Sequence, residues 1–203
     1  TTLETPAPVL EIDIQPIYLR IDENEEFKCT AEGDVEYLVR GQKAWGGHVW
    51  GGPIMAAATS LFVAVCCAPN NLHIFLRSGR RPFAPILLDG IATNVACQGS
   101  YLLALTSAKT LHLWDIGLQR SLLRTSINAL LADANTSAKV VDDIGVTEKG
   151  VPVITLSSGE SYVWDVSMEC FVCIADSHAS ASPFLTTPSH LYGYGKRGDE
   201  EPL

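Results

Sequence analysis

From residue 54 onward, the chain alternates short apolar runs with turn-forming residues. The runs are rich in Val, Ile, Leu and aromatic residues, and they are separated by Gly, Pro, Asn and Ser. Runs of about five to seven such residues are typical of β-strands, whereas helices need about ten or more residues with a period of 3.6. The pattern therefore predicts a mostly β protein.

Three stretches repeat one plan: a strand, a short turn, a strand that ends in an aromatic residue, and a third strand. The aromatic residues Phe75, Trp114 and Trp164 are 39 and 50 residues apart. This is close to the roughly 40–45 residues of a WD-repeat propeller blade, with one insertion before the last blade. The predicted strands are 61–66, 72–76 and 85–88, then 101–106, 111–115 and 120–123, then 153–157, 162–166 and 170–174.

Two further segments complete this architecture. In Ser126–Ala134, Ile127, Leu130 and Leu131 recur at three and four residues, which predicts a short amphipathic helix as the insertion. Residues 27–50 are interpreted as a further, degenerate unit. We therefore expect a WD-like incomplete β-propeller of about three to four blade-like units. A closed ring commonly needs about four to eight blades, so strand edges would be left for another chain to cover.

The composition excludes several other classes. With 47% hydrophobic and 18% charged residues, the chain is neither disordered nor a coiled coil. The longest apolar run, 54–68, is shorter than the roughly 20 residues of a membrane span. The net charge of −9, of which −7 lies in residues 1–40, argues against direct nucleic-acid binding. The absence of a leader, together with six cysteines, predicts an intracellular segment of a longer protein with reduced thiols.

No motif indicates catalysis, a cofactor or a metal. Cys170 and Cys173 have C-x-x-C spacing, but residues three apart on a strand point to opposite faces and do not readily share a metal. The G-x-G-x-x-G spelling at 193–198 is followed by only five residues, too few for the helix that binds a pyrophosphate. The glycine-rich stretch 45–53 carries two Trp residues and is interpreted as a connection between blades, with a ligand pocket as the alternative.

An aromatic stripe along the middle strands is the candidate interaction site. By alternation, one face of these strands carries an aromatic or His residue at every second position, and the other face carries aliphatic residues. Such a stripe packs between adjacent blades, or part of it forms a protein interface beside an uncovered edge. The candidate interaction residues are His112, Trp114, Asp115, Tyr162 and Trp164.

Residues 72–116, LHIFLRSGRRPFAPILLDGIATNVACQGSYLLALTSAKTLHLWDI, resemble the C-terminal region of the histone regulatory (HIRA/Hir) family. The shared pattern is a Gly-Arg-Arg turn, Pro-Ile-Leu-Leu, a Gly-Ser-Tyr opening to a buried strand, and Leu-x-x-Trp-Asp. The later stretch GVPVITLSSGESYVWDVSMECFVCIAD is similar to that family as well. The resemblance divides the chain into an acidic segment 1–34, a Hira-like β domain 35–178 and a flexible tail 179–203.

The resemblance implies a non-catalytic scaffold module of the nuclear HIR histone chaperone complex, which assembles nucleosomes independently of replication and represses transcription. It further implies self-association, as a trimer, and docking of a large helical-repeat subunit, with only indirect histone contact. The alternative is an unrelated WD-type adaptor that binds another partner through the same open edge.

Overall fold

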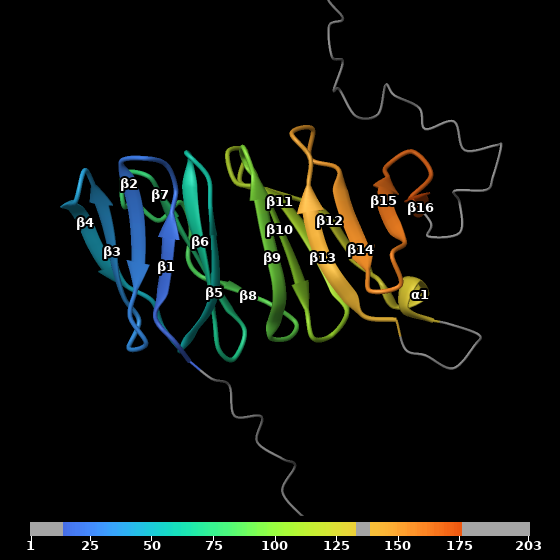
Figure 1. The fold of residues 1–203 in the computed structure, drawn as a ribbon, viewed down its shortest axis with the longest axis horizontal. Helices are drawn as coiled ribbons and strands as arrows, with labels where there is room; N and C mark the ends of the chain where they lie inside the picture. Colours follow the sequence, from blue (N-terminus) through green and yellow to red (C-terminus); the bar gives the residue numbers. More distant parts are fainter. Residues whose placement is uncertain (1–13, 133–138, 176–203) are drawn as a thin grey trace, which may run out of the picture.

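The computed structural model describes residues 14–132 and 139–175. They form four antiparallel four-stranded sheets, here called blades 1 to 4, in which the strands follow one another in chain order (Figure 1). Blade 1 contains β1 (Ile17–Arg20), β2 (Glu25–Cys29), β3 (Asp34–Val39) and β4 (Gln42–His48), and blade 2 contains β5 (Pro53–Ala58), β6 (Phe62–Cys67), β7 (Asn71–Leu76) and β8 (Ile86–Leu87). Blade 3 contains β9 (Ala92–Gln98), β10 (Tyr101–Thr106), β11 (Thr110–Asp115) and β12 (Arg120–Ser126), and blade 4 contains β13 (Val141–Val146), β14 (Pro152–Leu156), β15 (Ser161–Asp165) and β16 (Cys170–Ala175).

The blades stand side by side in a row, from blade 1 to blade 4 (Figure 1). Neighbouring blades touch through their first strands, since β1 contacts β5, β5 contacts β9, and β9 contacts β13. This is the arrangement of a propeller, in which the first strand of each blade lies innermost. The described residues therefore form an arc of propeller blades, and the predicted fold class is confirmed.

Burial along the middle strands reflects how many faces each blade covers. In β6 of blade 2, all six residues are buried, because both faces of the sheet pack against another blade. In β2 of blade 1, buried and exposed positions alternate at the first three residues, because only one face packs against another blade of the described residues. Continuous apolar runs are thus the sequence pattern of an internal blade, and alternation is the pattern of an end blade.

Three apolar cores lie between the blades. The core between blades 1 and 2 includes Phe27 and Phe75, the core between blades 2 and 3 includes Ile74 and Leu102, and the core between blades 3 and 4 includes Leu113. In the first core, the Trp45 ring stacks between Tyr37 and Phe75, with ring centroids 5.2 and 5.4 Å away.

The structure corrects several details of the sequence-based predictions. Each unit has a fourth strand, β5, β9 or β13, that precedes the three predicted ones. The predicted domain boundary after residue 34 cuts through blade 1, because β2 pairs with β3 from Glu25 to Val39. The predicted helical insertion is a single turn, α1 (Asn128–Leu131). The predicted tail, 179–203, lies outside the described residues.

The stretch 45–53 connects blades 1 and 2, as one of the two interpretations had it. Residues 45–48, however, belong to β4 rather than to a turn. Trp45 packs between the blades, and its indole Nε1 donates to the carbonyl of Arg77 at 2.9 Å. Trp50 is largely exposed, and its ring lies nearly perpendicular to the ring of His73, at an angle of 82°. Among the described residues, no helix is long and apolar enough to cross a membrane.

Candidate interaction groove

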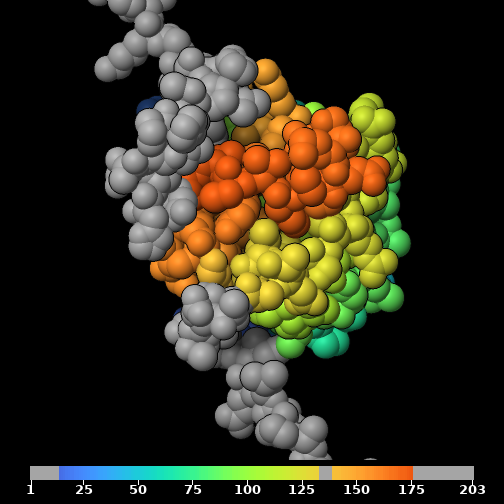
Figure 2. Space-filling view, turned by 90° about the vertical axis from the view of Figure 1, so that its right-hand side faces the viewer, coloured from blue at the N-terminus to red at the C-terminus, as the bar shows by residue number. Residues whose placement is uncertain are grey.

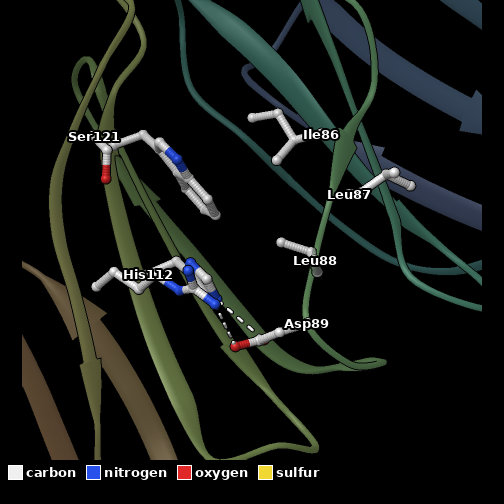
Figure 3. A pocket seen from close by; sticks show the side chains of 8 residues that line it. Ile86, Leu87, Leu88, Asp89, His112 and Ser121 are labelled. Atoms are coloured by element: carbon white, nitrogen blue, oxygen red, sulfur yellow. Dashed lines mark hydrogen bonds and ion pairs between the residues drawn. The ribbon is translucent and has the colours of Figure 1, made fainter.

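A groove of about 310 Å³ opens between the last strand of blade 2 and the outer strands of blade 3 (Figure 3). Its apolar wall comes from β8 and the residue after it, where Ile86 and Leu88 point into the groove while Leu87 turns the other way. Its opposite wall comes from β11 and β12. The lining residues are Ile86, Leu87, Leu88, Asp89, His112, Trp114, Ser121 and Arg124.

Strand alternation places Trp114 and His112 in this groove. Leu111 and Leu113 of β11 face blade 4, so the residues between and after them face blade 2. The His112 and Trp114 rings stack with centroids 5.2 Å apart and planes 6° apart. Trp114 is half-buried and packs on the core between blades 2 and 3. Its indole is therefore both part of that core and part of the groove wall.

The floor of the groove is held by the carboxylate of Asp89, which lies in the loop after β8. Thr106 Oγ1 donates to Asp89 Oδ1 at 2.9 Å, and His112 Nε2 lies 3.2 Å from the same oxygen. Arg124 Nη2 donates to Asp89 Oδ2 at 3.4 Å. These bonds tie the loop of blade 2 to three strands of blade 3 and fix the orientation of the His112 ring.

The pKa of Asp89 reflects this network. Partial burial of the carboxylate raises its pKa, but hydrogen bonds from the side chains of Thr110, Thr106 and His112 outweigh that effect and lower the pKa well below its ordinary value. Asp89 is therefore ionised at neutral pH and places a fixed negative charge beside the His112 ring.

The five candidate residues fall into three settings. His112 and Trp114 line the groove together. Asp115 is 6% exposed, and its Oδ1 accepts from the backbone N–H of Leu118 at 3.1 Å, so it closes the turn after β11. Tyr162 and Trp164 lie on β15 of blade 4, outside the groove. Tyr162 packs on the core between blades 3 and 4, and burial raises the pKa of its phenol.

Sequence reasoning identified two of the groove's eight lining residues, His112 and Trp114, as candidate site residues. Asp89 precedes His112 by 23 residues and sits in a loop, so no strand periodicity connects them. Ser121 was placed on a strand, but only the pairing of β11 with β12 sets it directly opposite Trp114. Arg124 lies on β12, the strand that also carries Ser121, and contacts Asp89 from there. These neighbours follow from the pairing of strands and the packing of two blades, which no local pattern encodes.

Sequential four-stranded meanders, stacked through apolar faces, define this molecule as a propeller-type repeat protein with a small surface groove between two blades. Solved structures that share less than 15% identity have the same fold, such as BamB from Moraxella catarrhalis, which is 13% identical and has a TM-score of 0.57 over 75% of this chain and 48% of that one. The family model described as Hira, TUP1-like enhancer of split, matches residues 79–191, and the chain belongs to this family.

Curated relatives agree with this assignment. Protein HIRA of Xenopus laevis is 30% identical over 86% of this chain and 16% of its own length, and Protein HIR2 of Saccharomyces cerevisiae is 31% identical over 60% of this chain and 15% of its own. The crystal structure of HIRA(644-1017) is 27% identical, with a TM-score of 0.69 over 81% of this chain and 54% of that one. The chain thus spans about a sixth of the length of these curated relatives.

Proposed function

We propose that this chain is a non-catalytic assembly module of a HIR-type histone chaperone complex in the nucleus. In this proposal, the complex assembles nucleosomes independently of replication and represses transcription, and this module connects its subunits. Membership of the Hira family supports the proposal, as does the chemistry of the groove. In the groove, the carboxylate of Asp89 is engaged by structural hydrogen bonds from Thr106 and Arg124.

The observation that carries the proposal is the half-buried indole of Trp114 at the wall of an open groove. Trp and Arg are among the residues most enriched at interface hot spots, and this groove holds one of each. Ile86 and Leu88 supply an apolar wall opposite the indole, so the groove suits an aliphatic or aromatic side chain from another polypeptide. Trp114 and His112 are the contact residues in this proposal, with Tyr162 and Trp164 of blade 4 as a second surface, and Asp115 shapes the strand end.

The partners proposed are further copies of this chain, forming a trimer, and a large helical-repeat subunit of the same complex. Histones are reached through other subunits. A net charge of −9 gives a nucleic-acid backbone little to bind directly.

The proposal is tested by filling the groove without disturbing the core. Ser121 is exposed and pairs directly with Trp114 across β11 and β12, so Ser121→Tyr places a ring beside the indole. Leu122→Tyr is the matched control, since Leu122 is the neighbouring exposed residue of β12 and does not line the groove. Light scattering after size exclusion, alone and with the helical-repeat subunit, reads out both contacts.

We expect Ser121→Tyr to keep the melting transition and to lose mass or subunit binding, while Leu122→Tyr retains both. Unchanged mass and unchanged binding in both variants would refute the groove as a contact site. If the unsubstituted chain does not bind the helical-repeat subunit but binds an unrelated protein, and Ser121→Tyr abolishes that binding, the result would favour a general WD-type adaptor.

A further inference from the structure

The four blades share one strand register, so equivalent positions can be compared at the three seams where one blade packs on the next. The equivalent cross-strand pairs, each separated by ten residues, are Phe27 with Tyr37, Ala64 with Ile74, Leu103 with Leu113, and Val153 with Val163. In blades 2, 3 and 4, the next residue along the chain is aromatic: Phe75, Trp114 or Trp164. Strand alternation turns this side chain toward the preceding blade. Each seam therefore has one aromatic ring at the same place.

In the seam between blades 1 and 2, Trp45 covers this ring. Trp45 lies on β4, the fourth strand of blade 1, directly opposite Tyr37. The centroids of the Trp45 and Phe75 rings are 5.4 Å apart, and the ring planes differ by 24°. In the loop between β7 and β8, Arg81 places its guanidinium carbon 4.7 Å from the centroid of Phe75. Stacked rings and a cation over a ring are favourable contacts, and Phe75 is only 2% exposed as a result.

In the seam between blades 3 and 4, an aliphatic residue has the place of Trp45. Leu123 of β12, the fourth strand of blade 3, lies directly opposite Leu113 and packs on the core between these blades. Figure 2 views the molecule from this end, where the orange and red residues of blade 4 lie against the yellow residues of blade 3. In two of the three seams, a large side chain from a fourth strand therefore occupies this position.

The groove lies in the third seam, between blades 2 and 3, where the fourth strand stops short of this position. β8 has two residues, whereas β4, β12 and β16 have six or seven. Ile86 of β8 pairs with Leu72. Ala84, two residues earlier, therefore has the chain position that corresponds to Trp45, but it is exposed and lies outside β8. Ala84 brings no large side chain to this place, and the groove opens there.

Two prolines explain why β8 is short. Pro82 and Pro85 stand on either side of Phe83 and Ala84. Proline lacks the N–H that pairs strands, so this segment does not extend the sheet. Phe83 packs on the core between blades 2 and 3, but it is not one of the residues that line the groove. The sequence of blade 2 thus interrupts the strand that covers the aromatic ring in the other two seams.

We propose that the groove binds an aromatic side chain of a partner polypeptide, which stacks on Trp114 as Trp45 stacks on Phe75. This inference rests on the proposed function, and it names the chemistry of the group that the groove takes. The groove continues the interface between blades 2 and 3 outward, because Trp114 and Ile86 belong to both. The planes of the His112 and Trp114 rings are 6° apart, and such a flat wall favours a planar ring over a branched aliphatic side chain.

The charges of the groove favour an uncharged ligand. Arg124 Nη2 and Asp89 Oδ2 bond to each other at 3.4 Å. A neutral ring leaves this pair intact, whereas a charged side chain meets one group of its own sign and competes for the other. Arg124 lines the same groove as Trp114, just as Arg81 lies over Phe75 in the other seam. It therefore places a cation beside the position of a bound ring.

The first test compares two substitutions of Trp114 in the natural polypeptide at its full length. Trp114→Phe recreates the ring on which Trp45 stacks in the other seam, and Trp114→Met keeps an apolar side chain without a ring. Light scattering after size exclusion, alone and with the helical-repeat subunit, gives the concentration at which each variant assembles, and melting curves show whether each is folded. We expect Trp114→Phe to assemble within about twofold of the unsubstituted concentration, and Trp114→Met to need at least about fivefold more protein.

The second test measures the ligand preference of an open groove. The same polypeptide is labelled with fluorotryptophan, and fluorine NMR follows the Trp114 resonance, which Trp114→Phe identifies by its loss. N-acetyl-tryptophanamide and N-acetyl-leucinamide share a blocked backbone and differ in the side chain. We expect the tryptophan amide to shift this resonance at a concentration at least about fivefold lower than the leucine amide. Ser121→Tyr should remove the shift, and Leu122→Tyr, outside the groove, should keep it.

The two tests together decide the proposal. An open groove shows its preference through the amides, and a groove already filled in the assembly shows it through Trp114→Phe and Trp114→Met. No preference for a ring in either test would overturn the proposal. If Trp114→Met does not fold, the amides decide alone, and equal midpoints or an absent shift then overturn it.

The proposed function is read separately, from the assembly of Ser121→Tyr. If that variant assembles normally while the tryptophan amide is preferred, the proposed function alone fails. If that variant does not assemble while neither test prefers a ring, this inference alone fails.

Discussion

Replacing Asp89 by Asn tests whether one loop carboxylate links blades 2 and 3. The substitution keeps the size of the side chain and removes its charge, so the bonds from Thr106, His112 and Arg124 at 2.9, 3.2 and 3.4 Å lose their charge assistance. Hydrogen bonds to a charged group each contribute about 1.5–3 kcal/mol when shielded from water. The Asp89 side chain is 24% exposed and Arg124 is well solvated, which reduces this contribution. We expect a loss of about 1–2 kcal/mol in the free energy of unfolding at pH 7.

The pH dependence of this loss follows from the lowered pKa of Asp89. A carboxyl group whose pKa is lower in the folded state than in the unfolded state stabilises the fold above its unfolded pKa, which is about 4. That stabilisation disappears as the pH falls from there toward the folded pKa. The difference between the wild-type chain and Asp89→Asn should therefore be constant from about pH 7 to pH 5 and should shrink below about pH 4.

Urea denaturation at pH 7, 5 and 3 measures both effects. Asp142→Asn is the matched control, because Asp142 is an exposed aspartate on β13 of blade 4 and its loss changes the net charge equally. If Asp89→Asn lowers the free energy of unfolding at pH 7 no more than Asp142→Asn does, the hydrogen-bond network around Asp89 does not link the two blades. A deficit that persists undiminished at pH 3 would show that it does not come from the charge of Asp89.

Two other substitutions test the packing between blades. Gly79 has φ of +83°, and a Cβ there would lie 2.8 Å from Cγ of Trp45, so Gly79→Ala should lower the free energy of unfolding by about 2–3 kcal/mol. Gly99 has φ of +56°, and a Cβ there would have nothing within 4 Å. Gly99→Ala is therefore the control and should lower the same free energy by about 1 kcal/mol or less in the same urea titration. Trp114→Ala removes a half-buried indole from the core between blades 2 and 3 and should lower the free energy of unfolding by about 3 kcal/mol, whereas Leu118→Ala, at an exposed turn, should change it by less than about 0.5 kcal/mol. Similar losses at the two positions of either pair would contradict the packing described here.

The sequence alone determined the repeating part of this protein. The runs that predicted 101–106 and 111–115 became β10 and β11 almost residue for residue, because an internal strand buried on both faces is a continuous apolar run bounded by turn residues. The first strand of each unit was not predicted, and in blade 3 the reason is that it lacks such a continuous apolar run. β9, Ala92–Gln98, mixes Thr, Asn and Gln with small residues, since it lies at the inner side of the arc, where partial exposure weakens the apolar pattern.

Tertiary structure decided where the chemistry lies. The sequence placed Trp114 on the face opposite Leu113, but only blade packing showed that this face meets blade 2 and that Ile86 and Leu88 lie opposite the indole. Asp89 joined the groove through a contact across 23 residues of chain, which a period of two along a strand cannot report. Likewise, the charge of Lys28 and the apolar character of Val163 were both visible in the sequence. The face of the sheet on which each of them lies followed only from the strand register, because cross-strand pairing sets which side chains share a face.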